Sequence, residues 1–280
     1  MPWLTSQPLN TQSQKQLDSY IAHLAKNFDD PKIDNNKFVR NELAKIIYAK
    51  SFKKLVKKSP LAALALDPKN IRFEAEYYIA TNQEKFAKVK PLLWFWKSID
   101  QTPLGQSISS GIPIRQMLGE RIFAKAGKNL KIFQNVEVSV GYNIEVGDDV
   151  AIHRDVFIDD IGGVKIGNKV SLSDYVSIFS HMHDLVNEAD VTLKEVVIGD
   201  KVRVGFSATI LAGTVLSDNS MLGAMAVATK DLDPHMIAVG IPAKARAKKA
   251  NSTTYPTVSI DARSYTKTPD IRANPDFNDD

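Results

Sequence analysis

The sequence has 280 residues, of which 44% are hydrophobic and 24% charged, and this ordinary balance excludes wholesale disorder. It contains no cysteine, which excludes a disulfide framework, a cysteine-ligated zinc and a cysteine nucleophile. The net charge of +4 does not require a nucleic-acid partner. The start from Met1 to Ser6 lacks the pattern of a secretory signal, and the apolar run from Leu61 to Leu66 is too short to span a membrane. We expect a soluble, cytoplasmic protein without a membrane span.

The first third of the chain has the spacing of amphipathic helices. Apolar residues recur with the rhythm i, i+3, i+4, i+7 from Leu17 to Leu24, and again from Val39 on toward Val56. A third helical stretch is predicted for residues 84–96. Lysines fill the second stretch at positions 45, 50, 53, 54, 57 and 58. A basic amphipathic helix can lie on a membrane surface, but the solvated face of a packed helix is the more ordinary interpretation and the one we favour.

A six-residue repeat occupies the middle of the chain. Two phase breaks divide it into blocks, and within each block the spacing is six. Thirteen consecutive positions of this register are apolar, where the composition predicts about six. They are Val140, Val146, Ile152, Ile158, Ile166, Leu172, Ile178, Ile198, Val204, Ile210, Leu216, Leu222 and Ala228. A second register, two residues earlier, runs through nine Val or Ile residues from Val138 to Val202.

This period fits short strands separated by corners. Six residues do not keep one face on a helix of 3.6 residues per turn, whereas apolar residues two apart share one side of a strand. Glycine often follows the apolar pair, with Asp or Asn next, as in Gly147-Asp148 and Gly167-Asn168. We expect these residues to supply the unusual backbone angles of the corners. The strands would stack as coils whose open ends need caps.

Five motifs in this order resemble the hexapeptide-repeat acyltransferases, and most closely the sugar O-acetyltransferases that include the maltose and galactoside enzymes. They are Ile198-Gly199-Asp200, Val204-Gly205, Leu222-Gly223-Ala224, Thr229-Lys230-Asp231 and Val239-Gly240-Ile241-Pro242-Ala243-Lys244. The resemblance covers roughly residues 110–248 and implies a left-handed parallel β-helix. The fold class is therefore mainly β with an α-helical N-terminal region. The expected divisions are a helical region 1–110, a β-helix domain 111–231, and a C-terminal segment with an extended tail 232–280.

The two interruptions of the repeat, near residues 160–163 and 179–195, are the places where loops can build a pocket on a flat wall. A hydroxyl that attacks a thioester needs a base, and histidine titrates in the right range. In the resembling family a histidine opens the longer loop and serves as this base. His181 matches that position and His183 is its rival. Asp184 either orients an imidazole or caps a turn, and we favour the first.

The resemblance also implies residues for the two substrates. His153 stands where the family commonly has Asn, against the acceptor, and we assign Asp155 and Asp160 to the acceptor site with it. The acyl donor should be acetyl-CoA, and no metal is expected. The residues matched to the donor are Gly205, Phe206, Ala224, Thr229, Lys230, Lys244 and Arg246.

The sequence thus predicts an acetyl-CoA-dependent O-acetyltransferase acting on a sugar or sugar-like hydroxyl, as a homotrimer. Three alternatives stay open. One is N-acyl transfer to an amino sugar. Another is a zinc enzyme resembling the γ-class carbonic anhydrases, with His153, His181 and His183 as ligands. The third is a non-catalytic β-helix scaffold whose helical region binds a partner.

Overall fold

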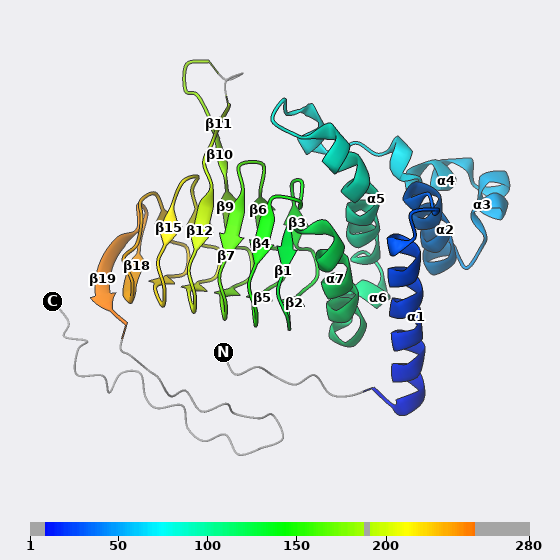
Figure 1. The fold of residues 1–280 in the computed structure, drawn as a ribbon, viewed down its shortest axis with the longest axis horizontal. Coiled ribbons are helices and arrows are strands. Elements are labelled where there is room, and N and C mark those ends of the chain that lie inside the picture. The colour runs from blue at the N-terminus through cyan, green and yellow to red at the C-terminus, as the bar shows by residue number, and fades with distance from the viewer. Residues whose placement is uncertain (1–8, 188–190, 250–280) are drawn as a thin grey trace. The chain divides into compact units, whose positions relative to one another are not determined.

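The computed structural model describes residues 9–187 and 191–249, which form one compact unit (Figure 1). Its N-terminal part is helical, with bounds as follows: α1 Thr11–Asp29, α2 Asn35–Tyr48, α3 Phe52–Lys58, α4 Pro60–Leu66, η1 Pro68–Asn70, η2 Glu74–Tyr77, α5 Gln83–Ile99, α6 Pro103–Gln106 and α7 Ile108–Ile122. The extended tail expected after residue 250 lies outside the described residues.

The predicted helices are confirmed at α1 and α5, but the second stretch is not continuous. Ala49 adopts a left-handed conformation with φ 50°, and its N–H donates to the carbonyls of Ala44 and Lys45. This cap ends α2, and Ser51 begins α3 by accepting a bond from the N–H of Lys54. The apolar spacing of the first third did not indicate α7. The expected start of the β-helix domain at residue 111 therefore lies within this helix, and the strands begin at Lys125.

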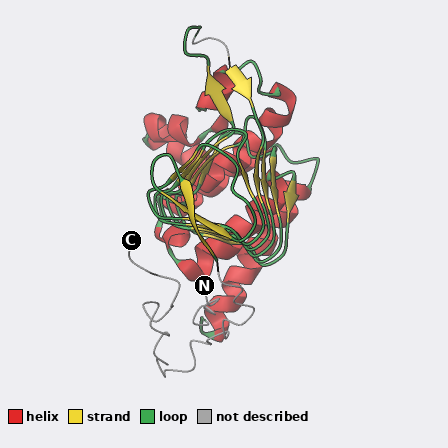
Figure 2. Ribbon diagram, turned by 90° about the vertical axis from the view of Figure 1, so that its left-hand side faces the viewer, coloured by secondary structure: helices red, strands yellow, loops and turns green. Residues whose placement is uncertain are grey.

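The rest of the unit is the predicted parallel β-solenoid, with three sheets as its faces (Figure 2). The first sheet holds β1 (Lys125–Ala126), β4 (Ile144–Val146), β7 (Val164–Ile166), β12 (Val196–Ile198) and β15 (Val215–Leu216). The second holds β2 (Lys131–Ile132), β5 (Ala151–Ile152), β8 (Ser171–Leu172), β13 (Arg203–Val204), β16 (Met221–Leu222), β18 (Met236–Val239) and β19 (Lys244–Lys248). The third holds β3 (Glu137–Val138), β6 (Phe157–Asp159), β9 (Ser177–Phe179), β14 (Thr209–Ile210) and β17 (Val227–Ala228).

The inner core is made by the apolar register, with one correction to its phase. All thirteen positions are buried, none more than 4% exposed. Val138, not Val140, is the residue that pairs with Ile158 and so holds the register. The step from Val138 to Val146 is eight residues, the same as the step from Ile158 to Ile166. The two breaks expected after Ile158 and Ile178 are present, and this earlier one was missed because Val140 is apolar and buried as well.

Gly141 has the expected unusual backbone angle, with φ 76°, but most glycines of the pattern act by close approach between coils. A Cβ at Gly167 would lie 2.8 Å from the backbone carbon of Gly199 in the next coil. The left-handed residue of that corner is instead Lys169, with φ 58°. The Asn and Asp side chains link the coils: Oδ1 of Asn168 accepts from the N–H of Asp148, and Oδ1 of Asp200 accepts from the N–H of Asn168.

Both ends of the solenoid are covered within the described residues. α7 packs against β1 and β2 at the first coil. Arg115 of α7 is 1% exposed, pairs with the buried Asp100, and donates through Nε to the carbonyl of Ile132 at 2.7 Å. At the other end β19 folds back antiparallel onto β18. No helix among residues 9–187 and 191–249 is long and apolar enough to cross a membrane.

Candidate functional site

Three departures from the six-residue step lie at one edge of the solenoid. Each connects a strand of the third sheet to a strand of the first: β3 to β4, β6 to β7, and β9 to β12. We call this the insertion edge and define it by residues 139–143, 159–163 and 180–195. Because neighbouring coils stack in register, these three connections lie one above the next. Residues from all three connections can therefore contribute to one site at this edge.

The longest insertion is a hairpin rather than an irregular loop. β10 (His181–His183) pairs antiparallel with β11 (Val191–Leu193), as Figure 1 shows above β9. Residues two apart on a strand point to the same side. The imidazoles of His181 and His183 accordingly meet with their ring centroids 5.3 Å apart. The break in the repeat indicated both histidines, but not the strand that places them together.

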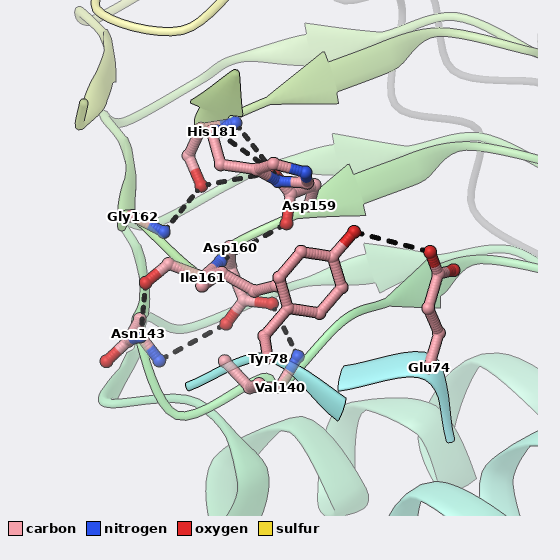
Figure 3. Close-up of polar contacts among 10 residues, drawn as sticks. Glu74, Tyr78, Val140, Asn143, Asp159, Asp160, Ile161, Gly162 and His181 are labelled. Atoms are coloured by element: carbon pink, nitrogen blue, oxygen red, sulfur yellow. Dashed lines mark hydrogen bonds and ion pairs between the residues drawn. The ribbon is translucent and has the colours of Figure 1, made fainter. Parts of the chain in front are cut away.

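His181 is held by Asp159 of the coil below (Figure 3). Its Nδ1 lies 2.6 Å from Oδ2 of Asp159, and the same oxygen accepts from the N–H groups of Ser180 and His181 at 2.9 and 3.2 Å. The Asp159 side chain is 1% exposed and that of His181 is 14% exposed. An ionised carboxylate only accepts hydrogen bonds, so Nδ1–H is the donor and Nε2 is left able to take a proton.

Close packing of the loops beneath His181 fixes this arrangement. The Oγ of Ser180 accepts from the N–H of Gly162 at 2.8 Å, and the carbonyl of Ser180 accepts from the N–H of Lys194. A Cβ at Gly162 would lie 2.1 Å from that carbonyl oxygen, so only glycine fits there. Ser180, the residue before His181, is thus hydrogen-bonded both to the 159–163 connection and to the returning end of the hairpin.

Asp160, which the sequence assigned to the acceptor, is turned into the fold instead. It is fully buried and accepts from the N–H of Val140 at 2.8 Å and of Asn143 at 3.3 Å (Figure 3). Burial raises the pKa of its carboxyl to about 6, against the opposing effect of these backbone bonds. Its carboxylate holds the 139–143 connection in place and has no surface to offer a substrate.

Asp184 has the turn-capping role that the sequence analysis held as the second choice. It is exposed, and its Oδ1 accepts from the N–H groups of Val186 and Asn187 at 2.8 and 2.9 Å. The residue that orients an imidazole is Asp159. Sequence reasoning missed Asp159 because it lies 22 residues from His181, and only the stacking of coils brings the two together.

The helical region supplies a wall that the sequence did not indicate. The ring of Tyr78 meets the edge of His181 at 5.2 Å between centroids and also lies 6.2 Å from His183. Its hydroxyl donates to Oε1 of Glu74 at 3.4 Å (Figure 3). Partial burial and the charge of Glu74 raise the pKa of Tyr78. No catalytic motif in residues 1–110 marked this segment, since its role depends on packing against the solenoid.

These groups enclose a cavity of about 400 Å³ at the insertion edge, a size suited to a small molecule. Its aromatic side chains can pack on apolar faces of a ligand. The Glu74 carboxylate, the Tyr78 hydroxyl and the two imidazoles can form hydrogen bonds with the ligand's polar groups. The lining residues are Glu74, Ala75, Tyr78, Ser139, Phe157, Ile161, Phe179, His181 and His183.

His153 and Asp155 lie at a different edge, between the second and third sheets. His153 stacks on Phe133 with centroids 4.9 Å apart, and burial lowers the pKa of its imidazole. Oδ1 of Asp155 accepts from Asn135 at 3.0 Å, and Asp155 lines a second cavity of about 400 Å³ beneath α5. Among the described residues no group of three or more His, Asp or Glu side chains is placed to hold a metal ion.

The residues matched to the acyl donor fall at three places. Gly205, Phe206 and Ala224 follow strands of the second sheet, at the same edge as His153. Thr229 and Lys230 follow β17 on the last coil, at the corner that leads from the third sheet back toward the first. Lys244 and Arg246 are exposed on β19. One chain therefore places Gly205 and His181 on opposite sides of the third sheet.

Comparison with known proteins places the chain in a family. No family model matches it. It is 30% identical to the galactoside O-acetyltransferase of Escherichia coli K12 over 139 residues, which are 48% of this chain and 68% of the relative. A maltose O-acetyltransferase of Clostridium difficile 630 superposes with a TM-score of 0.54 at 26% identity, covering 64% of this chain and 98% of that one. A galactoside acetyltransferase solved in complex with coenzyme A superposes with a TM-score of 0.54 at 25% identity, covering 62% of this chain and 88% of that one.

The chain belongs to the hexapeptide-repeat acetyltransferase family. The match covers 48% of this chain in the sequence comparison and 64% in the structural one, so it does not extend over the whole chain.

Proposed function

We propose that this protein transfers an acetyl group from acetyl-CoA to a hydroxyl of a sugar or sugar-like acceptor, with His181 as the general base. The observation that carries the proposal is the Asp159–His181 pair beside the cavity at the insertion edge of an acetyltransferase-family solenoid. The donor and the acceptor class follow those named for its relatives, one of which was solved with coenzyme A.

The proposed transfer consists of proton removal, attack on the thioester and departure of the thiol. Nε2 of His181 takes the proton of the acceptor hydroxyl while Asp159 holds the ring through Nδ1. The oxygen attacks the thioester carbonyl carbon and forms the new C–O bond. The C–S bond then breaks, and the sulfur leaves with the proton that His181 carries. Such base assistance contributes about 10²–10⁴ in rate.

Aromatic and carboxylate groups support a carbohydrate acceptor. Phe157, Phe179 and Tyr78 present rings to the cavity, and Glu74 can accept hydrogen bonds from hydroxyl groups. Lys230 and Lys244 are exposed cations suited to the phosphates of coenzyme A. The donor site would run from these lysines toward His181.

A homotrimer would complete the site. Gly205, Phe206 and Ala224 lie at one edge of the chain and His181 lies at the next. A groove lined by both sets needs the first edge of one copy to face the insertion edge of another. Three flat sheets per solenoid permit a closed ring of three such contacts. Sedimentation of the full chain tests this, and a monomer at working concentration would contradict it.

The decisive experiment is an acceptor screen with acetyl-CoA that measures released thiol. Glucose, galactose, maltose, lactose and glucosamine are the probes, and NMR of the product separates an ester from an amide. We expect ester products, and loss of about 10²–10⁴ in rate for His181→Ala with coenzyme A binding unchanged. His183→Ala is the matched control. A dead His183→Ala beside a nearly normal His181→Ala would overturn the assignment, and amide products alone would point to N-transfer.

A further inference from the structure

The short helix α3 carries a dense run of positive charge, and the uncharged helix α4 follows it directly. Between Leu43 and Leu66 the sequence has six lysines and no acidic residue. Four of the lysines lie on α3, at positions 53, 54, 57 and 58. All four are exposed, and none of them forms an ion pair with a carboxylate in the described part of the chain. Their charge is therefore not neutralised locally.

Apolar side chains are exposed on the same two helices. Leu55 is buried on α3, and Ala63 and Leu66 on α4, so these residues face the packed interior. Phe52 and Ala62 are partly buried against the core, but three large apolar side chains stay in solvent: Val56 is 45% exposed, Leu61 78% and Leu64 55%. We call Lys53, Lys54, Val56, Lys57, Lys58, Leu61 and Leu64 the basic–apolar patch.

We propose that the basic–apolar patch docks this protein on an anionic lipid surface. Lysines gain from the negative potential of such a surface, and leucine and valine side chains gain by entering the boundary between headgroups and acyl chains. Either component alone has an ordinary explanation, as solvated charge or as scattered surface apolar residues. Together on two adjacent helices, and without any intervening acidic residue, they match both parts of an interfacial membrane contact.

A lipid surface accounts for the apolar residues better than a nucleic acid does. Phosphate contacts would satisfy the lysines but would leave Leu61 and Leu64 in water. A bilayer interface satisfies both groups at once. The helices α3 and α4 pack on α2, and neither contributes to the cavity beside His181. The inference is thus independent of the acetyl transfer proposed above.

The test is co-sedimentation of the full chain with vesicles of phosphatidylcholine alone and of phosphatidylcholine with phosphatidylglycerol. We expect binding only to the anionic vesicles, and weaker binding at high salt. Lys57→Glu with Lys58→Glu should lower the partition coefficient about thirtyfold or more, because each lysine near an anionic surface contributes a factor of about five. Leu61→Ser with Leu64→Ser should lower it about tenfold.

The matched control reverses the same number of charges elsewhere. Lys125 and Lys128 are exposed at the first coil of the solenoid, and Lys125→Glu with Lys128→Glu should leave vesicle binding nearly unchanged. Three results would overturn the proposal: no binding to anionic vesicles, equal loss in the control, or unaltered binding in the Leu61→Ser, Leu64→Ser variant. Displacement of the protein from vesicles by a short DNA duplex would assign the patch to nucleic acid instead.

Discussion

Nδ1 of His181 lies 2.6 Å from Oδ2 of Asp159, although the two residues are 22 positions apart in the sequence. The insertion edge makes this contact, because His181 begins the hairpin that leaves β9 and Asp159 ends β6, the strand paired with β9. The carboxylate also accepts two backbone N–H groups. It is therefore fixed before any substrate binds, and it fixes which nitrogen of His181 can act as a base.

Asp159→Asn should lower kcat by about 10²–10⁴ with little change in the KM for acetyl-CoA. An amide at this position no longer favours the tautomer that leaves Nε2 free. The range is that of general-base assistance, and its upper end is the loss of about 10⁴ seen when the orienting carboxylate of a catalytic triad is replaced by an amide. Steady-state kinetics on the best acceptor measure it. Asp184→Asn serves as the control, since Asp184 caps an exposed turn. Equal activity of Asp159→Asn and the wild type would remove Asp159 from the mechanism.

Tyr78→Ala should lower kcat/KM for the acceptor about tenfold, since an aromatic contact of this kind contributes about 0.5–1.5 kcal/mol beyond its buried area. Tyr78→Phe keeps the ring against His181 and should lose much less. The KM for acetyl-CoA should not change in either variant. Tyr77→Ala is the neighbouring control, because Tyr77 is 76% exposed. If Tyr78→Phe lowered kcat/KM for the acceptor as much as Tyr78→Ala does, the hydroxyl and not the ring would be the group that contributes to acceptor binding.

The solenoid was predictable because its information is local and repeated. Most six-residue units bury the same two positions, so a periodic apolar pattern indicates the fold even where one phase is misplaced, as at Val140. The histidines were found because they interrupt that pattern. The reason given for the glycines holds at Gly141 but not at Gly167, since a close approach between coils leaves the same sequence signal as a left-handed turn.

The parts that sequence reasoning missed depend on contacts between distant segments. Asp159 stands in a strand beside a buried Ile158 and carries no motif of its own. Asp160 next to it is equally acidic, and only the fold shows that one carboxylate meets His181 and the other binds the backbone of Val140. Tyr78 belongs to a region without a recognisable repeat, so no spacing relates it to the solenoid.

Lys230→Ala or Lys244→Ala should raise the apparent KM for acetyl-CoA several-fold and leave the acceptor KM nearly unchanged. Both lysines are exposed, so their contacts with the phosphates are partly screened and each effect should shrink at high salt. Initial rates at varied acetyl-CoA and salt measure this. Lys128→Ala, at the other end of the solenoid, is the control. Equal damage to both substrates would place the donor in another groove.

Asp160 should make the folded state less stable as the pH rises through the range 4 to 7. Burial raises its pKa from 3.8 to about 6, so the folded protein binds this proton more tightly than the unfolded chain does. Stability due to the protonated carboxyl is present below pH 4 and is lost as the pH passes 6. A shift of about two units corresponds to about 3 kcal/mol. Urea unfolding of the wild type and Asp160→Asn should show their free-energy difference changing by this amount, and a constant difference would contradict the shift.

Arg115→Met should destabilise the protein by about 3–5 kcal/mol, because it leaves the buried Asp100 without its cation. Arg115 also donates to the carbonyls of Ile132 and Gly105, so its loss separates α7 from the first coil. Arg121→Met is a matched control on the same helix. Arg121 pairs with Asp29, whose side chain is 58% exposed, and such pairs contribute about 1 kcal/mol or less. Urea unfolding measures both variants. Equal losses of unfolding free energy in Arg115→Met and Arg121→Met would show that the buried Arg115–Asp100 pair stabilises the protein no more than the exposed pair does.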